Sequence, residues 1–181
     1  MIARLALALA VVLLAGATEA PSEPSGYRMD EYRAPVPATL QGATVLGTTE
    51  AHALWEKRAA AFIDVLPRPP RPAGLPAGTI WHPKPRKDLP GSIWLPDTGY
   101  GALAPVMEEY FARNLRQATH DDRDYPVVFY CLAECWMSWN AAKRALTLGY
   151  THVDWYPEGT DGWERAGLPL EPRDPMPRPD E

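Results

Sequence analysis

The stretch "VVFYCLAECWMSWNAAKRALTLGY", Val127 to Tyr150, decides the fold of this chain. It opens with an apolar run that is typical of a buried strand, and it continues in a helical pattern that ends at Gly149. A buried strand that leads directly into a helix is half of a βαβ unit. The chain's only two cysteines, Cys131 and Cys135, lie between the strand and the helix. The stretch therefore predicts an α/β domain with a cysteine loop at the carboxyl edge of a strand.

The same alternation of strand and helix recurs along the chain. Short apolar or β-branched runs predict strands over 43–48, 61–66, 91–96 and 152–157. Apolar residues at helical spacing predict helices over 48–61 and 101–119, and "PEGTDGW" at 157–163 reads as a turn. Strands and helices that alternate in this way form a mainly parallel sheet with helices on both faces. We therefore expect a single α/β domain over 43–170.

Prolines mark the parts of the chain outside this pattern. The chain has 21 prolines, and many of them fall in three segments. Residues 21–42 have few large apolar side chains and are expected to be extended over the surface or disordered. Residues 67–90 are expected to form a Pro-rich insertion loop, because proline disrupts both helices and central strands. Residues 171–181 are expected to form a polar C-terminal tail.

The first twenty residues predict export. They contain a basic Arg4, an apolar stretch over 5–14 and small residues before Ala17 and Ala20, which is typical of a cleavable secretory signal peptide. The apolar stretch is shorter than the roughly 20 residues of a membrane-spanning helix. An uncleaved N-terminal anchor is the alternative. We therefore expect a periplasmic protein that has no membrane association after cleavage.

The net charge argues against general binding to nucleic acids. The formal charge is −5 and the isoelectric point is near 5.4, whereas nucleic acids and anionic membranes attract basic surfaces. No segment resembles a cofactor cradle. The four histidines, His52, His82, His120 and His152, have no metal-ligand spacing, so we predict neither a cofactor nor a metal.

The cysteine loop has three interpretations. Backbone amides and the dipole of the following helix favour a thiolate, so Cys131 is a candidate nucleophile that forms a persulfide. Alternatively, Cys131 and Cys135 form a reversible disulfide, since their spacing places the Cα atoms about 6 Å apart. The two interpretations are compatible, because Cys135 could resolve a persulfide on Cys131. The third interpretation is a static structural staple, which a ring this short makes weak.

Four further residues are candidates for the site. Trp136 lies inside the loop and is expected to line the site, and Ser138 is expected at or near the N-cap of the helix. Glu134 is a candidate general acid or base, a charge that repels anionic substrates, or a solvated loop residue. Asp64 follows an apolar run and either orients a loop donor or caps the next turn.

The order of these motifs resembles a rhodanese domain over roughly residues 44–170. The resemblance rests on the strand, the cysteine, the Ala-Ala helix, "LGY" and "GTDGWERAGLPL", with "FIDV" and "LPGSIWLP" as earlier blocks. "CLAECWMSWNAAKRALTLGY" and "WYPEGTDGW" further resemble rhodanese-like proteins with a paired-cysteine and tryptophan motif that are associated with catabolism dependent on pyrroloquinoline quinone (PQQ). Two positions depart from the family: Trp136 replaces an Arg before the helix, and Leu66 replaces an Arg after the "FIDV" strand.

The resemblance implies a sulfurtransferase that acts through a persulfide on Cys131, with Cys135 as its neighbour or resolving partner. It implies a small sulfur donor or a thiol partner, in the setting of PQQ-dependent alcohol oxidation with a quinoprotein dehydrogenase or cytochrome. The rival hypothesis is a non-catalytic binding module, because a fold does not fix a function. Such a module would dock its partner through its tryptophans and the Pro-rich loop that carries Trp81.

Overall fold

The structure, a computed structural model, describes residues 20–69, 72–80 and 85–178. All of the predicted signal segment except Ala20 therefore lies outside the described residues. Among the residues described, no helix is both long and apolar enough to span a membrane.

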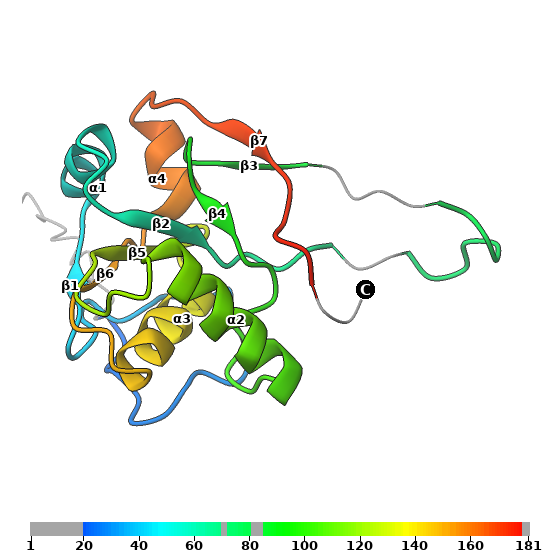
Figure 1. Cartoon of the computed structure of the whole chain (residues 1–181), viewed down its shortest axis with the longest axis horizontal. Coiled ribbons are helices and arrows are strands. Elements are labelled where there is room, and N and C mark those ends of the chain that lie inside the picture. Colours follow the sequence, from blue (N-terminus) through cyan, green and yellow to red (C-terminus); the bar gives the residue numbers. More distant parts are fainter. Residues whose placement is uncertain (1–19, 70–71, 81–84, 179–181) are drawn as a thin grey trace, which may run out of the picture.

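A parallel sheet of five strands forms the centre of the molecule, in the order β1-β6-β5-β2-β4 (Figure 1). Every neighbouring pair in this sheet is parallel. The strands are β1 (Thr44–Val45), β2 (Ala61–Asp64), β4 (Ile93–Trp94), β5 (Val127–Tyr130) and β6 (Val153–Trp155). Each of them falls within a predicted strand, and the predicted α/β class with a mainly parallel central sheet is confirmed.

Helices cover both faces of this sheet (Figure 1). They are α1 (Thr48–Glu56), α2 (Pro105–Ala118), α3 (Trp136–Thr147) and α4 (Gly159–Arg165). Side chains alternate along β5, so Phe129 joins the buried cluster of α2 and α3. Val128 and Tyr130 join the cluster of α1 and α4 on the other face. The cysteine loop directly follows β5 and therefore lies at the carboxyl edge of the sheet.

Helix α4 forms where the sequence predicted only a turn. Gly159 has a φ of +52°, which agrees with the turn signal, but the chain continues from it into a helix. The Thr160 amide donates to the Cys131 carbonyl at 3.0 Å, and Trp163 is fully buried. Tertiary contacts therefore stabilise a helix that could not be predicted from the sequence, because its residues are typical of a turn.

The Pro-rich segment and the C-terminal tail meet in a two-stranded antiparallel ribbon. β3 (Arg86–Asp88) pairs with β7 (Glu171–Arg173), so each of the two segments contributes a short strand. Residues 72–80 of the Pro-rich segment extend away from the body of the protein (Figure 1). The ribbon matters for the site because it carries Arg86 and Asp88.

The N-terminal segment is extended, and it is bound to the domain. Residues 27–40, which we call the strap, lie against α3 and the cysteine loop through backbone and side-chain hydrogen bonds. Arg33 and Cys135 form an isolated antiparallel bridge. Of the two states expected for this segment, the structure has the extended one.

Candidate functional site

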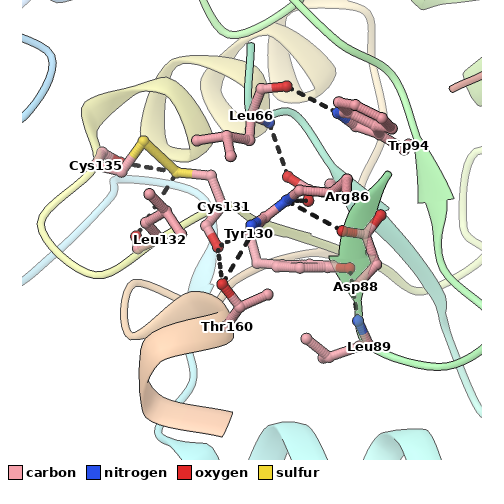
Figure 2. A network of polar contacts seen from close by, with 11 residues as sticks. Leu66, Arg86, Asp88, Leu89, Trp94, Tyr130, Cys131, Leu132, Cys135 and Thr160 are labelled. Atoms are coloured by element: carbon pink, nitrogen blue, oxygen red, sulfur yellow. Dashed lines mark hydrogen bonds and ion pairs between the residues drawn. A yellow bond between two sulfur atoms is a disulfide. The ribbon is translucent and has the colours of Figure 1, made fainter. Parts of the chain in front are cut away.

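Cys131 and Cys135 are joined by a disulfide at the carboxyl edge of β5 (Figure 2). Cys131 directly follows the strand, and Cys135 is the N-cap residue of α3. Their Cα atoms are 6.5 Å apart. Both side chains are buried, with 0% of Cys131 and 2% of Cys135 exposed. In this state the pair is oxidised and closed to solvent.

The carbonyl group of Cys131 is held by donors from two other segments. It accepts from the Thr160 amide at 3.0 Å and from Arg86 Nη2 at 3.3 Å. Gly159 lies so close that a Cβ atom there would be 2.4 Å from the same oxygen. The first residue of the loop is thus fixed by α4 and by the ribbon.

Arg86 belongs to a buried cluster with two acids (Figure 2). Its Nε lies 2.7 Å from Asp64 Oδ2 and 3.1 Å from Asp88 Oδ1, and both acids are 0% exposed. The contact with Asp88 is an ion-pair distance without hydrogen-bond geometry. Burial, and then the charge of Asp64, raise the pKa of Asp88 to about 9. The raised pKa favours the protonated, neutral form of Asp88 at pH 7.

Asp64 performs both of the roles that the sequence left open. Its Oδ1 accepts from the Leu66 amide at 2.7 Å and caps the turn after β2. Its Oδ2 holds Arg86, which in turn donates to the Cys131 carbonyl. Sequence reasoning did not single out Arg86, which reaches Asp64 from β3. The sequence feature that could have indicated Arg86 is its position two residues before Asp88, in a segment that was otherwise expected to be solvated.

The other predicted site residues divide between solvent and core. Glu134 is exposed and has a φ of +50°. Trp136 is 2% exposed, and its ring nitrogen donates to the Pro35 carbonyl of the strap at 3.1 Å. Ser138 lies in the first turn of α3, because Cys135 takes the N-cap position. Its hydroxyl donates to the Cys135 carbonyl at 3.1 Å and accepts from Trp155 Nε1 at 3.0 Å.

Two of the loop amides that could cradle an anion already have acceptors. The Ala133 amide donates to Asp161 Oδ2 at 3.0 Å, and the Trp136 amide donates to the Tyr32 carbonyl of the strap at 2.9 Å. A substrate anion would therefore have to displace the strap to reach the Trp136 amide. The present geometry is that of a resting oxidised state.

One pocket among the described residues lies away from the cysteine loop. A surface pocket of about 690 Å³ is lined by Trp55, Phe62 and Ile93, at the amino ends of β2 and β4 and thus at the opposite edge of the sheet. Within the described ranges, no three His, Cys, Asp or Glu side chains are grouped so that they could hold a metal ion.

No family model and no curated protein matches the sequence. Among solved structures, the polysulfide-sulfur transferase homodimer of Wolinella succinogenes is similar over 74% of this chain and 81% of its own, with 19% identity and a TM-score of 0.46. A human single-domain sulfurtransferase covers 68% of this chain and 96% of its own, with 22% identity and a TM-score of 0.41.

The thiosulfate sulfurtransferase of Pseudomonas aeruginosa has a TM-score of 0.50 with 20% identity, over 74% of this chain. The match spans 21% of that longer protein. At this level of identity the likeness concerns the fold alone: the chain has an α/β fold with a parallel central sheet, like the matched part of that sulfurtransferase.

Proposed function

We propose that Cys131 and Cys135 form a sulfur-transfer centre that cycles between a dithiol and a disulfide. The observation that supports this most is the disulfide between the residue after β5 and the N-cap of α3, since both thiols of one loop are within bonding reach. A persulfide on Cys131 would lie beside the thiol that can resolve it. The protein is thereby a candidate sulfurtransferase that acts through a cysteine persulfide.

The proposed reaction has three steps. In the reduced protein, the Cys131 thiolate attacks the outer sulfur of thiosulfate, the sulfur–sulfur bond of thiosulfate breaks, and sulfite leaves with the electron pair. Cys135 then loses its proton to solvent and attacks Cys131 Sγ. The disulfide forms, and the outer sulfur takes up one proton from solvent and leaves as hydrosulfide, so that the two thiols supply two electrons to the transferred sulfur. A dithiol reductant returns the disulfide to two thiols and completes the cycle.

Intact mass spectrometry of the reduced, mature protein tests this reaction. With thiosulfate or a small persulfide donor, Cys135→Ser should gain about 32 Da, because Cys131 keeps its extra sulfur when the resolving thiol is missing. The wild type should instead lose about 2 Da as the disulfide forms, with release of an equal amount of sulfide. Cys131→Ser is the matched control and should show neither change. A Cys135→Ser protein that stays at its starting mass with every donor would refute the proposal.

The burial of both cysteines favours a second candidate, a binding module that uses the fold without catalysis. A nucleophile with 0% exposure is not available to a substrate in this state. For such a module, Cys131→Ser would leave partner binding intact. Trp81, part of the predicted docking loop, lies outside the described residues.

The cellular setting is a separate proposal, supported by the first twenty residues and by the motif resemblance. We place the mature protein in the periplasm, as an accessory to PQQ-dependent alcohol oxidation with a quinoprotein dehydrogenase or a cytochrome as partner. Fractionation of expressing cells, followed by the intact mass of the periplasmic form, tests export and cleavage. Retention of the full-length mass in the membrane fraction would favour the uncleaved anchor.

A further inference from the structure

We infer that the strap, residues 27–40, is an autoinhibitory cover that must move before a small thiol or sulfur donor can reach the cysteine pair. The inference concerns the regulation of the centre proposed above and rests on that function. It is carried by the contacts that the strap makes on both sides of Cys135.

The strap brackets Cys135 with backbone hydrogen bonds. Before the cysteine, the Glu134 carbonyl accepts from the Ala34 amide at 3.2 Å. After it, the Trp136 amide donates to the Tyr32 carbonyl at 2.9 Å. Cys135 itself is bridged to Arg33 between these two bonds. The strap therefore forms a short antiparallel ladder with the cysteine loop, and it provides the hydrogen-bond partners of the Glu134 carbonyl and the Trp136 amide.

Helix α3 provides three further anchors for the strap. Asn140 is fully buried and forms a reciprocal pair with Arg28: its Oδ1 accepts from the Arg28 amide, and its Nδ2 donates to the Arg28 carbonyl, both at 2.9 Å. The ring nitrogens of Trp136 and Trp139 donate to strap carbonyls at 3.1 and 3.2 Å. The Arg28 guanidinium also lies 5.2 Å from the centre of the Trp136 ring. The tryptophans after Cys135 thus bind a segment of the chain itself.

The strap is the part of the cover that can open at the lowest cost. The Cys131 carbonyl accepts hydrogen bonds from Arg86 and from the Thr160 amide, which do not belong to the strap. The strap has no helix or strand of its own, and Glu31, Arg33 and Pro35 are exposed. Tyr32, Ala34 and Val36 pack on the core, so opening has a cost, but a segment without regular secondary structure still opens more readily than a sheet or a packed helix. A reagent that attacks the disulfide should therefore enter where the strap lifts.

Two variants weaken the strap from opposite sides without touching a cysteine. Ala34→Pro removes the amide that donates to Glu134, and Ala34→Ser is its matched control because it keeps that amide. Gly101→Ala would place a Cβ atom 2.3 Å from the Arg28 carbonyl and push the strap outward. Gly26→Ala is the matched control, since nothing lies within 4 Å of a Cβ atom there.

The measurement is the rate at which excess dithiothreitol reduces the disulfide in the mature, full-length protein, followed by alkylation and intact mass. Loss of one backbone hydrogen bond should raise the rate about five- to tenfold in Ala34→Pro, with an increase of similar size in Gly101→Ala. The two controls should stay within about twofold of the wild type. Near-UV circular dichroism and the urea midpoint establish that each variant is folded, and either folded variant suffices for the test.

Equal reduction rates in the wild type and in the folded variants would overturn the inference, because the reagent would then reach the sulfurs without moving the strap. The sulfur-uptake assay is independent of this result. Faster reduction without any sulfur uptake would leave the strap as a cover and refute the proposed function. Sulfur uptake with unchanged reduction rates would support the function and refute the cover.

Discussion

Replacing Arg86 by methionine should destabilise the domain by about 4 kcal/mol at pH 7. The change leaves Asp64 fully buried without its cation. Breaking one side of a buried ion pair costs roughly 3–5 kcal/mol.

Urea denaturation at pH 7, followed by tryptophan fluorescence, measures this loss of stability. Lys87→Met is the matched control, because Lys87 is exposed on the same strand and its loss should change the free energy of unfolding by less than about 0.5 kcal/mol. A loss below about 1 kcal/mol for Arg86→Met would show that Arg86 does not neutralise a buried Asp64 charge.

Three further changes probe the same edge of the sheet. The pKa of Asp88 is raised to about 9, so the folded protein holds a proton that the unfolded chain releases near pH 4. The stability of the wild type should therefore fall as the pH rises between these two values. Asp88→Asn should flatten that slope in urea titrations from pH 5 to 8. Gly159→Ala should cost about 2 kcal/mol or more in the same assay, since its Cβ atom would meet the Cys131 carbonyl and φ is positive. Glu134→Gly should instead raise stability by about 1 kcal/mol, seen as a higher melting temperature, because Glu134 holds a φ of +50° on the surface.

The sheet and three of the helices could be predicted because their signals are local. β2 and β5 are apolar runs whose side chains are buried on both faces, which is what a central parallel strand requires. In α2 the buried residues recur at helical spacing, as the sequence pattern indicated. Such patterns depend only on which side chains of one element are buried. They can therefore be recognised in the sequence without knowledge of distant contacts.

Arg86 and the strap could not be predicted in the same way, because their partners are distant. Arg86 lies 22 residues from Asp64 and 45 from Cys131 in sequence. The strap meets α3 across a separation of 112 residues, at Arg28 and Asn140. Arg86 is held by polar contacts that only the folded chain creates. In the strap, Tyr32, Ala34 and Val36 alternate and pack on the core, but this pattern is too short to predict a partner.

The two ends of the cysteine loop are held by different parts of the molecule, and this bears on how the pair works. The Cys131 end is tied to Arg86 and Thr160 in the body of the domain, while the Cys135 end is bracketed by the strap. If the strap lifts as proposed, Cys135 loses the hydrogen bonds around it but keeps its place as the N-cap of α3, where the Ser138 hydroxyl donates to its carbonyl. Cys131 keeps its own support. Strap opening would thus expose the disulfide while the two sulfurs stay side by side, so that Cys135 can resolve a persulfide on Cys131 without a further rearrangement of the loop.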